Sequence, residues 1–178
     1  MRARIGGYVV DMVIFAAVAM VMIVIAGALL LFATDFAEQD PSDADTYTFL
    51  GVIALGTPAA WTLLNLPLLT TRGQTGGQYV AGVRVVREGD GRATAGQCAA
   101  WWFCLNPLLF SWPMAIVVGF PLAAVVALVI DEFAVVVTAA IVVLCAVAPL
   151  IALFSAGFDR RNRTLYDRIA GTRVIPAE

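Results

Sequence analysis

Apolar residues gather in four long runs that are separated by polar segments. The runs cover Tyr8 to Ala33, Thr48 to Thr70, Cys98 to Ile130 and Phe133 to Phe158. A helix needs about 20 residues to cross roughly 30 Å of hydrocarbon, so each run is long enough to span a membrane. The pattern predicts an all-α membrane fold with four transmembrane helices in a single domain, residues 1–178, with spans at 8–33, 48–70, 111–130 and 133–156.

The third run is too long for one straight span. As a helix, residues 98–130 would extend for about 50 Å, well beyond the bilayer core. Proline removes a backbone donor and breaks or kinks a helix, and the run contains Pro107, Pro113 and Pro121. Two alternatives remain. Residues 98–110 form either the first part of one kinked, tilted span, or a separate interfacial helix with Trp101, Trp102 and Phe103 at the headgroup boundary, which we favour.

Composition supports a membrane protein. The chain is 61% hydrophobic and 13% charged, whereas soluble domains carry about 25% charged residues. The first run does not resemble a cleavable signal peptide, because it exceeds the roughly 7 to 15 residues of such a core and contains Asp11. The partner that this composition requires is the lipid bilayer.

The positive charges are confined to three segments. All 11 basic residues are arginines, and they lie before the first span, in the loop 71–97 and in the tail 159–178. In the other two connections, all of the charged residues are acidic. Because arginine is enriched in cytoplasmic loops, we expect both termini in the cytoplasm. Anionic lipid at that face accounts for the arginines without a nucleic-acid partner.

Two cytoplasmic segments resemble each other. Residues 75–86 align without a gap with residues 164–175, at a fixed offset of 89, and five of twelve positions are identical. The same offset relates the first two spans to the last two, which predicts two parallel helical-hairpin repeats; the alternative is chance similarity. Each copy ends in a β-type run, and we expect these runs, 83–86 and 172–175, to form a β-hairpin or small sheet beside a turn at 88–92.

Asp11 is the one ionisable residue clearly inside a span. A carboxylate there costs about 2.5 to 3.5 kcal/mol on insertion scales, so it is expected to face the bundle interior. Asn65 and Asn106 lie at comparable depths beside prolines, which free backbone carbonyls. These three residues form a candidate ion or substrate site. The alternative is that they only hold helices together. Arg4, on the same helix face, is about 10 Å from Asp11 along the axis.

Several chemistries have no support in the sequence. The chain lacks histidine and lysine, and it has neither a phosphate-binding lysine loop nor a nucleophile elbow. We therefore expect no enzyme, catalytic residue, cofactor or metal site. The three cysteines form no Cys-x-x-Cys pair and are interpreted as small lipid-facing or packing residues; they are Cys98, Cys104 and Cys145.

Three separated motifs carry a resemblance to a known family. The first is Arg4 with Asp11 seven residues later, the second is the Gly-Gln-Thr-Gly-Gly loop that begins at Gly73, and the third is residues 163–174. Together they resemble the RDD family of small bacterial and archaeal membrane proteins. The resemblance makes Arg4, Asp11 and Asp167 the signature arginine and two aspartates. It also implies a multi-pass protein of a prokaryotic cytoplasmic membrane. Gln78 and Tyr166 stand where the family commonly has lysine and histidine.

Transport of ions or small solutes has been suggested for members of this family, whose molecular function is largely undefined. Two hypotheses result. In the first, a transporter-like homo-oligomer binds a cation or proton at Asp11. In the second, the protein is a non-transporting scaffold or accessory subunit, in which Arg4, Asp11 and Asp167 form a structural ion-pair network.

Overall fold

A computed structural model gives the fold of the chain. It describes residues 2–89, 91–104, 136, 140, 143, 147 and 150–177. The predicted third span, Asn106, Cys145 and most of the predicted fourth span therefore lie outside the described residues. The two predicted helical-hairpin repeats and the count of four spans remain predictions for the same reason.

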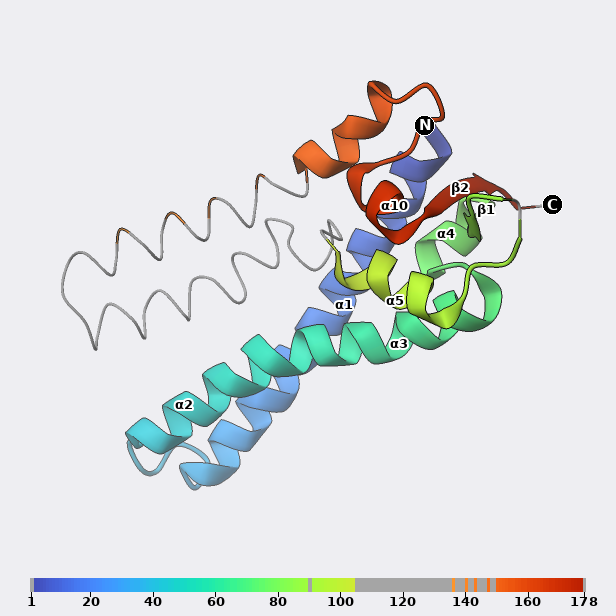
Figure 1. The fold of residues 1–178 in the computed structure, drawn as a ribbon. Helices are drawn as coiled ribbons and strands as arrows, with labels where there is room; N and C mark the ends of the chain where they lie inside the picture. The colour runs from blue at the N-terminus through green and yellow to red at the C-terminus, as the bar shows by residue number, and fades with distance from the viewer. Residues whose placement is uncertain are drawn as a thin grey trace.

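The first two spans form a long helical hairpin (Figure 1). Its first arm is α1, Arg2–Ala33, and its second arm runs without interruption from α2, Asp43–Gly51, through a π-helical turn, η1, Val52–Gly56, into α3, Thr57–Arg72. The arms contain 32 and 30 residues, and within the described residues they are the two helices long and apolar enough to cross a membrane. The predicted first and second spans thus correspond to long helices.

Each arm buries a narrow stripe and exposes the rest of its surface. Residues about four apart lie on one helix face, and the buried positions follow this spacing in both arms. They are Gly7, Asp11, Phe15 and Ala19 on α1 and Ile53, Thr57, Trp61, Asn65 and Leu69 on the second arm. Large apolar side chains such as Val24 and Leu63 are 70% and 74% exposed. Such helix surfaces are suited to lipid.

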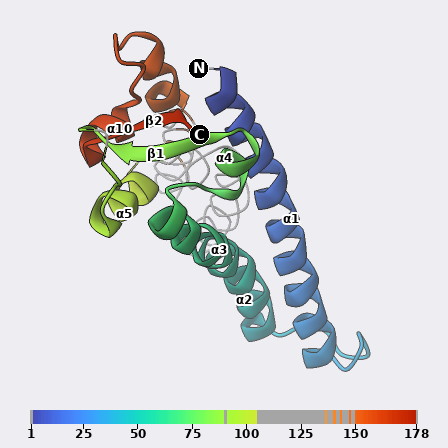
Figure 2. The same ribbon diagram turned by 90° about the vertical axis from the view of Figure 1, so that its right-hand side faces the viewer.

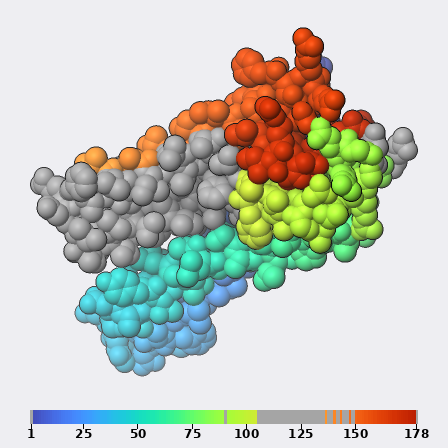
Figure 3. Space-filling model, viewed as in Figure 1, coloured from blue at the N-terminus to red at the C-terminus, as the bar shows by residue number. Residues whose placement is uncertain are grey.

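Short elements form a cap at the end of the hairpin where both termini lie (Figures 1 and 2). The cap consists of α4, Gly76–Val80, β1, Val83–Arg87, α5, Ala95–Phe103, α10, Leu165–Ala170, and β2, Thr172–Pro176. The space-filling view shows the C-terminal residues packed directly on the β1–α5 region (Figure 3). The cap thus joins segments from both halves of the chain to the first turns of α1.

The predicted small sheet is present. Strands β1 and β2 pair antiparallel, with Val85 opposite Val174. These two valines are equivalent positions of the sequence repeat, so the strands are related by a local two-fold axis between them. Gly82 and Gly171, also equivalent, precede the strands, and both have φ of +63°, which glycine adopts without steric cost.

The helical turns before the strands are also alike. In α4, the Thr75 hydroxyl accepts a hydrogen bond from the Gln78 N–H while the Gln78 side chain accepts one from the Thr75 N–H. In α10, Thr164 and Asp167 make the same reciprocal pair. Such a capping box satisfies two amide donors that a helix start leaves unpaired. The two cap segments therefore resemble each other in structure as well as in sequence.

The short helix α5 ends at Phe103, and the next residue, Cys104, has extended backbone angles. Trp101 and Trp102 are 1% and 0% exposed, so their rings contact protein instead of the headgroup boundary that the sequence suggested for them. Trp102 packs on Trp61, with ring centroids 6.0 Å apart. Of the three aromatic residues, only Phe103 is exposed, at 55%. Hydropathy could not separate a lipid surface from a protein surface here.

Candidate functional site

Asp11 binds the start of α4. Its side chain is buried, with the residue only 2% exposed. The Thr75 hydroxyl donates to Asp11 Oδ2 at 2.5 Å, and the Gly77 N–H donates to Oδ1 at 2.7 Å. Both carboxylate oxygens are therefore engaged, and both donors are neutral groups. This arrangement fixes α4 against the third turn of α1.

Close backbone approach makes these hydrogen bonds possible. A Cβ atom on Gly77 would lie 2.6 Å from Asp11 Cγ and 2.7 Å from Asp11 N, and it would also collide with the Gly7 carbonyl oxygen. A Cβ atom on Gly7 would make only ordinary van der Waals contacts with Ala81 Cβ and Gln78 Cα, at 3.4 Å and 3.5 Å. The Gly77 backbone thus lies directly against the α1 backbone, which explains why a glycine is required at position 77.

Asn65 holds the neighbouring residue of the same turn. Its Oδ1 accepts the Gly76 N–H at 3.2 Å, and its Nδ2 donates to the Trp61 carbonyl at 3.1 Å. Asp11 on α1 and Asn65 on α3 therefore bind successive amides of α4, Gly77 and Gly76. The start of α4 closes over both arms of the hairpin.

Asp167 is the second buried carboxylate, at 0% exposure. Arg4 Nη1 donates to its Oδ2 at 2.7 Å, the Trp101 indole N–H donates to Oδ1 at 2.7 Å, and the Thr164 N–H donates to Oδ2 at 2.9 Å. Three elements, α1, α5 and α10, thus meet at one side chain. Arg4 also approaches the Val174 carbonyl at 3.5 Å.

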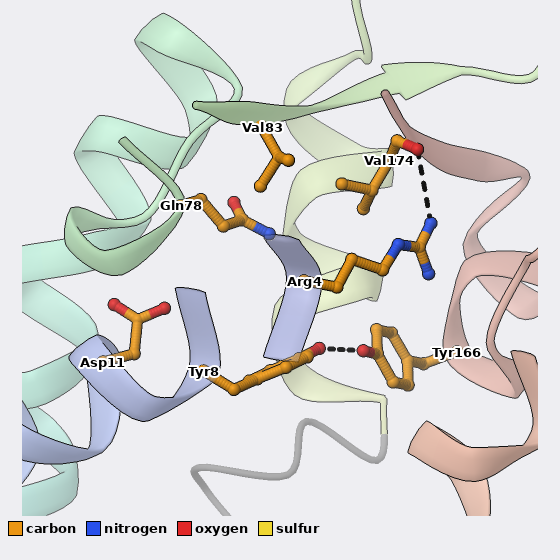
Figure 4. Close-up of a pocket in the computed structure, with 7 residues that line it drawn as sticks. All are labelled: Arg4, Tyr8, Asp11, Gln78, Val83, Tyr166 and Val174. Atoms are coloured by element: carbon orange, nitrogen blue, oxygen red, sulfur yellow. Dashed lines mark hydrogen bonds between the residues drawn. The ribbon is translucent and has the colours of Figure 1, made fainter. Parts of the chain in front are cut away.

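A pair of tyrosines lies beside this ion pair. The hydroxyl groups of Tyr8 and Tyr166 are hydrogen-bonded to each other (Figure 4). Burial, and then the neighbouring Asp167 carboxylate, raise the pKa of Tyr166 well above its usual value. The Tyr166 phenol therefore stays neutral, and the tyrosine pair adds a second polar link between α1 and α10.

A small cavity lies between Asp11 and the side chains of Arg4 and Tyr166 (Figure 4). It is lined by Arg4, Tyr8, Asp11, Gln78, Val83, Tyr166 and Val174, and its volume is about 10 Å³. That volume is near the lower limit for one water molecule. Arg4 extends toward Val174 and away from Asp11 (Figure 4). Within the described residues, Asp11 has no ion-pair partner.

The RDD family model matches residues 1–171 of the chain. The chain belongs to the RDD family. Neither a curated protein nor a solved structure matches it.

The RDD signature residues occupy two neighbouring sites. Arg4 and Asp167 form an ion pair at 2.7 Å, whereas Asp11 binds α4 on the other side of the small cavity. Asn65 lies next to the Asp11 site through Gly76. Asn106 lies outside the described residues. Within the described part of the RDD chain, no cluster of three or more potential metal-ligating His, Cys, Asp or Glu side chains occurs.

Sequence reasoning missed the groups that bind the two carboxylates. Gly77 acts through its backbone amide, which leaves no mark on a hydropathy profile. Thr75 and Thr164 could have been found, because threonine three residues before Gln78 or Asp167 is the spacing of a capping box. Trp101 gave no signal of its own, since its indole is equally suited to a headgroup boundary.

Proposed function

We propose that this RDD protein is a non-enzymatic scaffold or accessory subunit of the membrane, in which the two carboxylate sites fix the cap to the spans. One observation carries the proposal. Asp11 is 2% exposed, and both of its oxygens accept hydrogen bonds from α4. The carboxylate therefore presents almost no accessible surface to a cation.

The size of the adjoining cavity also supports a static role. A volume of about 10 Å³ leaves no room for a hydrated ion beside Asp11. Asp167 is likewise fully engaged by an arginine, an indole and an amide. Buried polar groups satisfied in this way rigidify the elements that they join.

We further propose that the cap faces the cytoplasm of a prokaryotic cell and that both termini are cytoplasmic. The distribution of charge supports this orientation. Exposed arginines such as Arg72, Arg87, Arg92 and Arg168 lie in or next to the cap, whereas the loop at the far end of the hairpin carries Asp35, Glu38 and Asp40. Arginine enrichment marks cytoplasmic segments. Reporter fusions at Asp40 and at the C-terminus test the proposal, and an external C-terminus would refute it.

Reconstitution into liposomes tests the static role. The protein is expected to give no more sodium or proton flux than protein-free liposomes. The Asp11→Asn variant should behave likewise but unfold at a lower temperature, because a hydrogen bond to a charged group contributes about 1.5 to 3 kcal/mol. Flux that disappears in a folded Asp11→Asn variant would overturn the proposal.

A second candidate function, transport of a cation or proton through Asp11, has one observation in its favour. The donors to Asp11 are neutral, and within the described residues no arginine forms an ion pair with it, so a bound cation would supply the missing positive charge. The cavity beside it is lined by Tyr8, Gln78 and Tyr166, and also by Arg4, whose positive charge opposes a cation. This function predicts flux that depends on Asp11, and a homo-oligomer would provide the additional helices that alternating access needs.

A further inference from the structure

A second cavity lies where α3 ends and α4 begins. Its volume is about 110 Å³, and it is lined by Leu68, Arg72, Gln74, Thr75, Gly76 and Tyr79. That is several times the volume that one water molecule needs. We call it the α3–α4 cavity. It shares Thr75 and Gly76 with the Asp11 site, so whatever occupies it contacts the turn that Asp11 holds.

The charge of the α3–α4 cavity is positive. Arg72, in the last turn of α3, is exposed, and within the described residues its guanidinium group has no ion-pair partner. No acidic side chain lines the cavity. Arg92 brings a second guanidinium group to the same helix end, where it donates to the carbonyls of Thr71 and Thr70, the latter at 3.3 Å. The site is therefore suited to an anionic group.

Besides the polar residues Gln74 and Thr75, the cavity has a largely apolar surface. Leu68 and Tyr79 line it and are 38% and 65% exposed, and the nearby Leu64 and Val80 are 54% and 67% exposed. These side chains extend from α3, a candidate membrane span, onto the outer face of α4. A ligand that matches this surface has an anionic head beside apolar chains, and Tyr79 is the type of residue found at the membrane interface.

We propose that the α3–α4 cavity binds an anionic phospholipid, with the phosphate at Arg72 and the acyl chains along Leu68 and Tyr79. The apolar lining favours lipid over a soluble anion. Because Thr75 lines the cavity and its hydroxyl binds Asp11, the lipid stabilises the turn that joins α4 to α1. Lipid binding here is independent of whether the protein is a scaffold or a transporter.

Lipid titration of the purified chain in detergent tests the proposal. The probe is phosphatidylglycerol, and the readouts are bound lipid by native mass spectrometry and the unfolding temperature. We expect phosphatidylglycerol to bind and to raise the unfolding temperature. Arg72→Gln should weaken binding about fivefold, since an arginine near an anionic surface contributes roughly that factor. Arg72 is exposed, so the unliganded variant should unfold near the wild-type temperature.

Arg87→Gln is the matched control, because Arg87 is an exposed arginine of the cap outside the cavity. It should bind phosphatidylglycerol as tightly as the wild type. Equal weakening by both variants would mean diffuse attraction and would overturn the site. Equal stabilisation by phosphatidylcholine, or by inorganic phosphate, would overturn the requirement for an anionic lipid. Leu68→Asn should weaken binding of phosphatidylglycerol, and an unchanged affinity would refute the acyl-chain contact.

Discussion

Asp11 and Asp167 are both buried carboxylates, 2% and 0% exposed, but the protein surrounds them differently. Asp167 receives a guanidinium group, an indole N–H and an amide. Asp11 receives only a hydroxyl and an amide. Removing either partner of a buried ion pair leaves the other charge buried and uncompensated, which is strongly destabilising. The stabilisation of the Asp11 carboxylate depends instead on the backbone geometry of the turn that begins α4.

The repeat makes this comparison sharper. Gln78 and Asp167 are equivalent positions, and both accept the amide of the threonine that caps their helix. In the first copy this residue is neutral, and the carboxylate comes from α1. In the second copy the capping residue is itself the carboxylate, and α1 supplies Arg4. Each copy thus has one carboxylate at its helix start. In the first copy α1 provides the carboxylate, Asp11, and in the second copy α1 provides its cationic partner, Arg4.

The largest expected effect comes from the ion pair. Asp167→Asn removes the negative partner of Arg4, whose side chain is only 10% exposed, and should lower the free energy of unfolding by about 3 to 5 kcal/mol. Thermal or denaturant unfolding in detergent measures the loss. Glu88→Gln is the control, because Glu88 is 43% exposed and pairs with Arg161 and Arg163; a surface pair contributes about 0 to 1 kcal/mol. Equal losses of stability in the two variants would contradict a larger contribution from the buried ion pair than from the surface pairs.

The second effect tests the shape of the Asp11 site. Gly77→Ala places a methyl group against Asp11 and the Gly7 carbonyl, and an overpacked contact costs typically 1 to 3 kcal/mol; we expect about 3, because backbone atoms cannot move aside. Gly76→Ala is the matched control, since its nearest neighbour is the flexible end of Ile14 at 3.2 Å. Unfolding curves that rank Gly76→Ala as the more damaging change would contradict the geometry.

The smallest effect separates the two repeat copies. Thr75→Val removes a cap and the hydroxyl that binds Asp11, whereas Thr164→Val removes only a cap, which contributes about 1 kcal/mol. The first variant should be less stable than the second by about 1.5 to 3 kcal/mol, the contribution of a hydrogen bond to a charged group. Serine at either position keeps the hydroxyl and should restore most of the stability. Indistinguishable valine variants would mean that Thr75 does not hold Asp11.

The sequence predicted the parts of the fold that repeat along the chain. Hydropathy placed the end of the first helix at Ala33, where α1 ends, and the offset of 89 matched the two strands that pair. The cost of a charge in a span also predicted that Asp11 faces the interior, where the structure places it together with Asn65. These features depend on local periodicity and charge, which a sequence shows directly.

The sequence did not predict the hydrogen-bond and packing partners of those residues. Asp11 binds a backbone amide 66 residues away, and any residue except proline could provide such a donor. Trp101 and Trp102 appeared suited to lipid because hydropathy measures transfer from water and does not identify the apolar partner. Similarly, the close approach of Gly7 and Gly77 depends on how α4 turns after Arg72, and only the structure gives that angle.

The pairing of β1 with β2 also sets an order of events during synthesis. Val85 and Val174 are partners, and at roughly 5 to 20 residues per second the second leaves the ribosome about 4 to 18 s after the first. During that interval β1 has an open edge, and Arg4 has no aspartate to pair with. The cap therefore closes only when the last strand has been made, so a chain that stops before Asp167 loses the ion pair and the sheet together. Synthesis of α10 and β2 thus has to precede the docking of the first turn of α1 onto the cap.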